Sequence, residues 1–125
     1  MRALAGCELV AFVPTTDPER ARRFYGEILG LPLVSETPIA CVFRARQTLL
    51  RVTVVKRHSP APYTVLGWIV SDIGKTVGEL RRRGVRFRLY DGMDQDELGI
   101  WSAPDGARVA WLVDPDGNTL SVTQL

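Results

Sequence analysis

The sequence has no long apolar run, only one histidine and only two cysteines. A membrane-spanning helix needs about 20 consecutive apolar residues, and no stretch of this chain approaches that length. The first ten residues, MRALAGCELV, also lack the apolar core of a secretory signal peptide. We therefore expect a cytoplasmic protein with no membrane partner.

The scarcity of histidine and cysteine limits the chemistry of the chain. Cys7 and Cys41 lie in strand-like runs without CxxC spacing, which predicts two buried thiols and neither a disulfide nor a metal site. His58 lies in a proline-rich segment, where a solvated surface histidine is more typical than a ligand. Neither a GxSxG motif nor a phosphate-binding glycine loop is present, so no nucleophile with a positioned base can be named.

The net charge and the chain length indicate which kind of protein this is. The net charge is +2, and the basic residues are spread along the chain except for Arg81, Arg82 and Arg83. These three fall at the end of a predicted helix, where cations favour the helix dipole, so the sequence argues against nucleic-acid binding. With 125 residues, 46% of them hydrophobic, the chain is long enough for one globular domain with a real core.

The first half of the chain follows the pattern βαβββ. Strand-like alternation at 8–13 precedes a helix over 18–29, with Asp17 as its N-cap, Pro18 at its first position and Gly30 past its end. Three further strand-like segments follow, at 33–36, 39–45 and 48–55. The segment 57–63 is rich in proline and polar residues and is predicted to be a linker.

The second half repeats this plan. A strand over 65–70 leads to a helix over 73–83 that Asp72 caps and Gly84 ends, and three strand-like runs follow, RFRLY, ARVAWLVD and NTLSVTQ. The closing strands of the halves also match in sequence, TLLRVT against NTLSVT. We therefore predict two βαβββ modules, at about 7–56 and 64–125, paired in one domain over 1–125.

These residues resemble a known family. The segment FYGEILGLPL after a capped helix and the ending PDGARVAWLVDPDGNTLSV are similar to the vicinal oxygen chelate superfamily, which includes glyoxalase I, bleomycin-resistance proteins and extradiol dioxygenases. The resemblance implies an α+β fold in which two βαβββ modules form a curved mixed sheet around a cavity, with the helices on the outer face. It also implies a homodimer.

The resemblance locates the family's metal positions, and the residues at them are poor ligands. Val65 and Ser121 fall at two of these positions, and Arg51 aligns with Ser121 in the first module. An arginine stays protonated in a protein and cannot ligate a metal. The remaining position holds either Glu8 or Val10, and the apolar strand ends favour Glu8. A single carboxylate cannot hold a catalytic ion, so we expect no metal and no cofactor.

The predicted cavity is apolar with few polar groups, which is typical of a small-molecule site. Alternation along the closing strand places Leu50 and Val52 under the helix and Arg51 on the inner face, where we expect an ion pair with Glu8. This pair either satisfies two buried charges or anchors a ligand. The other residues expected at the site are Val10, Phe12, Val65, Gly67, Ile69, Ser121 and Trp101.

The tryptophans are interpreted separately. Alternation places Trp68 in the core, and Trp111 belongs either to the core or to the cavity. Trp101 follows the polar segment DGMDQDELGI and is expected on a mobile connection at the cavity mouth, where it stacks on a flat ligand or contacts a second copy of the chain.

Two classes of function remain open. The first is a metal-free small-molecule-binding protein of the glyoxalase/bleomycin-resistance type, with an apolar or aromatic ligand in a cavity between the modules. The alternative is an enzyme of the same superfamily, a lyase, isomerase or dioxygenase, which is metal-dependent or uses Glu8 as general acid or base. The absence of suitable ligands favours the binding protein.

Overall fold

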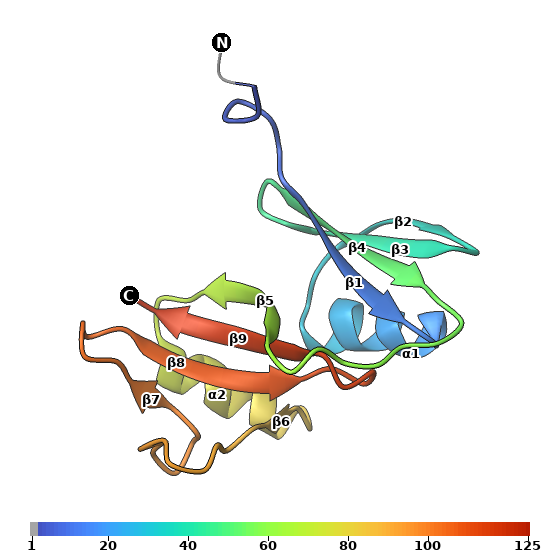
Figure 1. Ribbon diagram of the computed structural model, residues 1–125. Coiled ribbons are helices and arrows are strands. Elements are labelled where there is room, and N and C mark those ends of the chain that lie inside the picture. The colour runs from blue at the N-terminus through green and yellow to red at the C-terminus, as the bar shows by residue number, and fades with distance from the viewer. Residues whose placement is uncertain (1–2) are drawn as a thin grey trace. The chain divides into compact units, whose positions relative to one another are not determined.

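The structure is a computed structural model that describes residues 3–125. The chain forms two compact units, of which the first ends at His58 and the second begins at Ser59. Each unit contains one sheet and one helical segment (Figure 1). This arrangement confirms the predicted α+β class with two modules, and the boundary falls within the predicted linker.

The first unit has a four-stranded sheet in the order β1-β4-β3-β2. Strand β1 runs parallel to β4, and the other neighbours are antiparallel. The elements of this unit are β1 Val10–Thr15, α1 Pro18–Arg22, η1 Arg23–Ile28, β2 Leu33–Thr37, β3 Ala40–Ala45 and β4 Thr48–Val54.

The second unit repeats this topology, with strand order β5-β9-β8-β6 and β7 paired to β8. Its opening strand β5 is again parallel to its closing strand β9. The elements are β5 Thr64–Ile69, α2 Ile73–Arg82, β6 Arg86–Phe87, β7 Trp101–Ser102, β8 Arg108–Val113 and β9 Thr119–Gln124. The sequence predicted every one of these except β7, and it predicted a longer β6.

The two helices begin in nearly identical ways. Asp17 has φ −141° and ψ 95°, and its Oδ1 accepts a hydrogen bond from the backbone N–H of Arg20 at 3.1 Å. Asp72 has φ −141° and ψ 93°, and its Oδ1 accepts from the N–H of Lys75 at 3.1 Å. An N-cap of this kind stabilises a helix by about 0.5–2 kcal/mol. The duplication predicted from sequence thus extends to backbone geometry.

The first helix departs from α geometry in its second half. Segment η1 is a π-helix, in which the N–H of Leu29 donates to the carbonyl of Phe24, five residues back, at 2.8 Å. Phe24 and Tyr25 are both buried there, and their rings meet edge to face at 5.1 Å between centroids. The second unit has an ordinary α-helix at this place.

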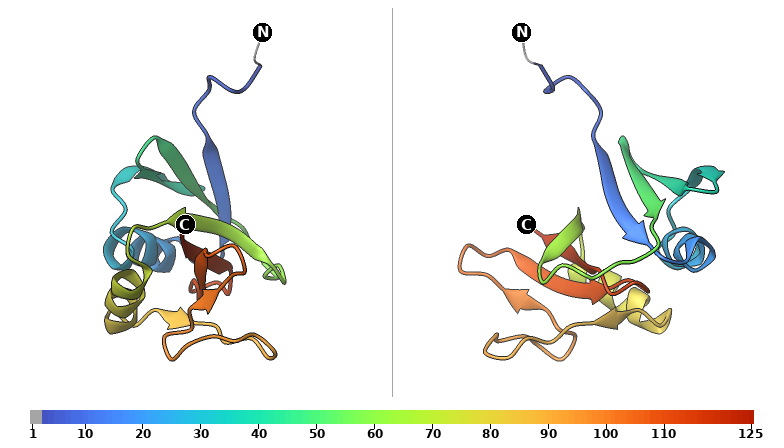
Figure 2. Two further views of the ribbon diagram at one scale, coloured as in Figure 1. Left: turned by 90° about the vertical axis from the view of Figure 1, so that its left-hand side faces the viewer. Right: turned by 45° about the vertical axis from the view of Figure 1, so that its right-hand side comes forward.

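Each helical segment covers one face of its own sheet and encloses that unit's core (Figure 2). The first core includes Val13, Ala21, Phe24, Tyr25, Cys41, Phe43, Leu50 and Val52. The second includes Ile73, Val77, Val85, Ile100, Ala110, Leu112, Leu120 and Val122. We call the sheet face opposite the helix the open face of each unit.

The open faces carry apolar side chains that remain accessible. Phe12 of β1 is 59% exposed and Ile69 of β5 is 74% exposed. No helix within residues 3–125 combines the length and apolar character needed to cross a membrane.

Candidate functional site

Arg51 lies on the open face of the first unit, as strand alternation predicted. Its neighbours Leu50 and Val52 are buried beneath the helical segment, whereas Arg51 is half-buried on the opposite side of β4. Its partners in register are Phe12 on β1 and Val42 on β3.

The prediction of an ion pair between Arg51 and Glu8 is wrong. Glu8 is exposed and precedes β1, in a segment that extends beyond the sheet of its unit (Figure 2). Arg51 is in register with Phe12, four residues after Glu8, which corresponds to about 13 Å along a strand. No ion pair between the two side chains occurs in the described part of the chain.

The same registers show that Val10, and not Glu8, corresponds to Val65. Arg51 pairs with Phe12, and the equivalent Ser121 pairs with Gly67. Stepping two residues back along each opening strand reaches Val10 in one unit and Val65 in the other. The preference for Glu8 at the first family position was therefore wrong, because parallel strand pairing sets the alignment and the local sequence does not.

The residues at the family's metal positions do not fit a metal ion. Val10 and Val65 offer no donor atom, Arg51 offers only N–H donors, and Ser121 offers a neutral hydroxyl. Across residues 3–125, no group of three or more His, Cys, Asp or Glu side chains is close enough to hold an ion. We derive no chemistry through a metal.

Val65, Gly67 and Ser121 lie together on the open face of the second unit. Val65 is 37% exposed, and Gly67 is in register with Ser121 on the adjacent strand β9. A side chain at position 67 would place its Cβ 2.5 Å from the Ser121 Oγ, so glycine is the residue that leaves Ser121 undisturbed. Because Gly67 has no side chain, the open face of the sheet has a shallow depression beside Ser121.

An aromatic cluster occupies the same open face beside Ser121. Trp111 on β8 is in register with Ser121, which assigns it to this face and not to the core. Its ring lies 5.4 Å from that of Tyr90, nearly perpendicular at 89°, and 6.2 Å from that of Trp101. We call Tyr90, Trp101 and Trp111 the aromatic trio. Trp68 has the opposite parity, since it pairs with buried Val122 on the helix-facing side.

The position of Trp101 corrects one expectation. Trp101 begins strand β7 and pairs with Val109 of β8, so it belongs to the sheet and not to a mobile connection. The polar segment before it is also well organised. Asp96 Oδ1 accepts hydrogen bonds from the N–H groups of Leu98 and Ile100, both at 2.9 Å.

Gln95 fixes two members of the trio relative to each other. Its side-chain oxygen accepts from the N–H of Tyr90 at 2.7 Å, and its amide nitrogen donates to the carbonyls of Arg88 at 3.1 Å and Gly99 at 2.9 Å. The backbone of Gln95 also bridges to Trp101. One side chain therefore ties the segment that carries Tyr90 to the segment that carries Trp101.

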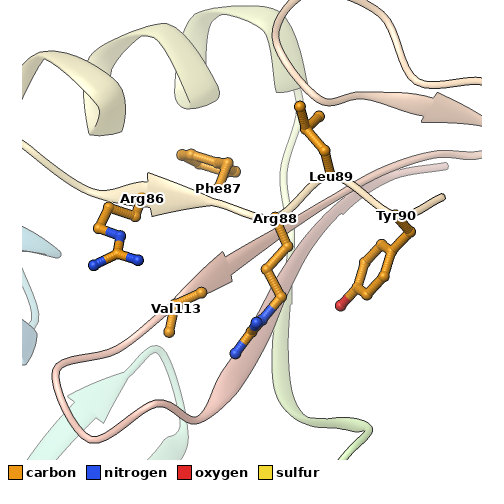
Figure 3. Close-up of a pocket in the computed structure, with 6 residues that line it drawn as sticks. All are labelled: Arg86, Phe87, Arg88, Leu89, Tyr90 and Val113. Carbon is orange, nitrogen blue, oxygen red and sulfur yellow. The ribbon is translucent and has the colours of Figure 1, made fainter.

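A pocket of about 370 Å³ adjoins the trio. Arg86, Arg88 and Tyr90 project to one side of the segment 86–90, as does Val113 of β8, while Phe87 and Leu89 project to the other (Figure 3). These pocket residues were not predicted from the sequence, whereas Trp111, which the sequence left open between core and cavity, lies on the open face. The alternation Arg-Phe-Arg-Leu-Tyr over 86–90 was the signal that could have found the pocket.

The two cysteines differ from each other. Cys41 is buried as predicted, but Cys7 is exposed, and both are free thiols. Cys41 Sγ lies 3.6 Å from Glu36 Oε2, which lies 3.5 Å from Arg22 Nε. Burial raises the pKa of the Cys41 thiol, and the charge and hydrogen bonding of Glu36 raise this pKa further.

The chain belongs to the Glyoxalase/Bleomycin resistance protein/Dioxygenase superfamily, whose family model matches residues 8–122. This result confirms the resemblance inferred from the sequence. No curated protein matches the chain significantly.

Among solved structures, a member of the superfamily from Sphaerobacter thermophilus DSM 20745 is similar over 96% of this chain and 98% of its own, with 24% identity and a TM-score of 0.77. Lactoylglutathione lyase from Agrobacterium tumefaciens is similar over 95% and 93%, with 17% identity and a TM-score of 0.71. TnmS3, an antibiotic-binding protein from Streptomyces sp. CB03234, is similar over 97% of each chain, with 22% identity and a TM-score of 0.71. At these identities the similarity establishes the fold.

Proposed function

We propose that this protein binds a flat aromatic small molecule, without a metal ion, against the open face of its second sheet. The aromatic trio is the observation that carries this proposal. Its three rings come from separate segments of the chain and meet on the face of their sheet opposite α2. Proteins of similar fold include TnmS3, an antibiotic-binding protein, which is compatible with a binding role.

The trio is suited to stacking because it is held in place before any ligand arrives. Trp111 is set by its strand pairing, and Gln95 fixes the backbone that carries Tyr90 and the segment before Trp101. A preorganised surface loses little conformational entropy on binding. Aromatic pairs contribute about 0.5–1.5 kcal/mol beyond the area they bury.

The metal-free part of the proposal rests on residue chemistry at the family positions. Val10, Arg51, Val65 and Ser121 supply no anionic or imidazole ligand among them. The exposed position of Glu8 before the first strand gives little support to the alternative in which Glu8 acts as general acid or base. After dialysis against chelator-free buffer and incubation with zinc, nickel, manganese or ferrous iron, we expect far less than one equivalent bound. Stoichiometric retention would contradict this part.

The binding itself is tested by calorimetric titration with naphthalene-2-carboxamide, a neutral flat probe. We expect saturable binding that Trp111→Leu weakens by about tenfold, since one stacking contact is lost. Trp68→Leu is the matched control, because it removes the same side chain from the helix-facing side of the same sheet and should change affinity less than twofold. Thermal unfolding of both variants verifies folding.

The proposal fails if the neutral probe and a panel of larger planar compounds show no saturable binding. It also fails if Trp68→Leu and Trp111→Leu weaken binding equally, because the ligand would then not rest on the trio.

A further inference from the structure

The pocket beside the aromatic trio carries two positive charges and no negative one. Arg86 and Arg88 both line it, together with Tyr90 and Val113. Neither arginine has a carboxylate partner among residues 3–125. Unpaired guanidinium groups that face one pocket create a positive potential in it.

Three neighbouring arginines of the same unit, at the end of α2, have partners outside the pocket. Arg82 and Arg83 both pair with Glu79, and Arg81 donates to the carbonyl of Leu98 at 2.8 Å. Arg86 and Arg88 differ from these three in that both line the pocket and neither has a carboxylate partner among the described residues.

Arg88 is held in position by neutral acceptors. Its Nε donates to Thr119 Oγ1 at 3.2 Å, and its Nη2 donates to the carbonyl of Gly117 at 3.3 Å. These contacts fix the guanidinium without neutralising its charge, and they leave further N–H groups for another acceptor. Arg88 is half-buried, so the local dielectric constant is lower than in water and its charge attracts an anion more strongly.

We propose that Arg86 and Arg88 bind the carboxylate of an aromatic acid whose ring stacks on the trio. This inference rests on the proposed function and specifies its ligand class. Tyr90 connects the two parts, because it lines the pocket and also lies 5.4 Å from Trp111, centroid to centroid. A guanidinium donates two parallel N–H bonds to a carboxylate, which makes this group the best match.

The test compares two probes that differ only in charge, naphthalene-2-carboxylate and naphthalene-2-carboxamide. Hydrogen bonds to charged groups correspond to roughly tenfold or more in affinity each, so the carboxylate should bind at least tenfold more tightly at low salt. This advantage should shrink as sodium chloride is raised, because salt screens partly exposed charges.

Arg86→Met and Arg88→Met should each reduce the advantage of the carboxylate by about tenfold while leaving carboxamide binding unchanged. Arg44→Met, an exposed arginine of the first unit, is the charge-matched control and should have no effect. Because Arg88 also contacts Thr119 and Gly117, its removal could unfold the unit, and exposed Arg86 then provides the test alone.

Equal affinity of the two probes for the wild-type protein, or an undiminished carboxylate advantage in Arg86→Met, overturns the inference and leaves the proposed function intact. Failure of both probes to bind rejects the proposed function, and this inference falls with it. A larger effect in Arg44→Met than in Arg86→Met would mean that only net charge matters, which also overturns it.

Discussion

Asp114 closes the DPDG turn between β8 and β9, and its replacement by alanine should strongly destabilise the second unit. Its Oδ1 accepts from the N–H of Asp116 at 3.0 Å and of Asn118 at 2.9 Å, and its Oδ2 accepts from the side-chain amide of Asn118 at 2.8 Å. Asp114 is 4% exposed and Asn118 is 2% exposed. The carboxylate is thus the acceptor for two buried donors on one residue.

The size of the effect follows from burial. A hydrogen bond to a charged group contributes about 1.5–3 kcal/mol, and a buried donor left without a partner costs about 1–3 kcal/mol. In Asp114→Ala the backbone N–H of Asp116 can hydrogen-bond to water, but the backbone and side-chain N–H groups of Asn118 stay buried. We therefore expect the substitution to lower the free energy of unfolding by about 3–5 kcal/mol. Asp114→Asn keeps one acceptor oxygen and should cost roughly half as much.

The chain contains its own control in a second PDG turn. Asp105 Oδ1 accepts from the N–H of Ala107 at 3.0 Å, but this aspartate is exposed. Asp105→Ala should therefore cost less than about 1 kcal/mol, because water replaces the lost acceptor.

Urea denaturation followed by tryptophan fluorescence measures this difference selectively, since Trp68, Trp101 and Trp111 all belong to the second unit. With a urea dependence of about 1–2 kcal/mol/M, the midpoint should fall by about 1.5 M or more in Asp114→Ala. Equal midpoint shifts in Asp114→Ala and Asp105→Ala would refute the reasoning.

Three further predictions concern backbone, thiols and assembly. Gly117→Ala should lower the free energy of unfolding by about 1–2 kcal/mol more than Gly106→Ala. Both glycines have positive φ (86° and 94°), but only at position 117 would the new Cβ lie 2.8 Å from Pro60 Cγ. Equal losses of stability in the two variants would contradict this. A thiol reagent at neutral pH should label Cys7 quickly, whereas Cys41, buried and with a raised pKa, should react only after denaturation, and rapid labelling of two thiols in the native protein would contradict this. Light scattering should give twice the chain mass, as expected if exposed sheet edges are covered by a second copy, and a monomeric mass at micromolar concentration would remove the prediction.

The sequence predicted best those features that local chemistry determines. The helix beginnings at Asp17 and Asp72 and the positive-φ glycines Gly30 and Gly84 need only a few neighbouring residues, and all were located correctly. Alternation along β4 likewise placed Arg51 on the correct face, because the pleat alone decides it.

Features that depend on distant pairing were missed. The predicted pairing of Glu8 with Arg51 failed because the register of two parallel strands cannot be read from the sequence of either strand alone. Strand β7 has two residues and depends on pairing with β8 and with Gln95, so the sequence around Trp101 carried no recognisable strand signal. The aromatic trio depends in addition on Gln95, whose three side-chain hydrogen bonds no local pattern predicts.

The π-helical segment η1 accounts for a difference in length between the two helical segments. Gly30 follows the N-cap Asp17 by 13 residues, whereas Gly84 follows the N-cap Asp72 by only 12, so the first helix holds one residue more between equivalent caps. A π-helix is the form that an α-helix takes when it absorbs such an insertion. The difference between the duplicated halves was thus accommodated inside the helix, which kept both caps in place. Deletion of exposed Glu27 is therefore expected to convert η1 into an α-helix between the same two caps.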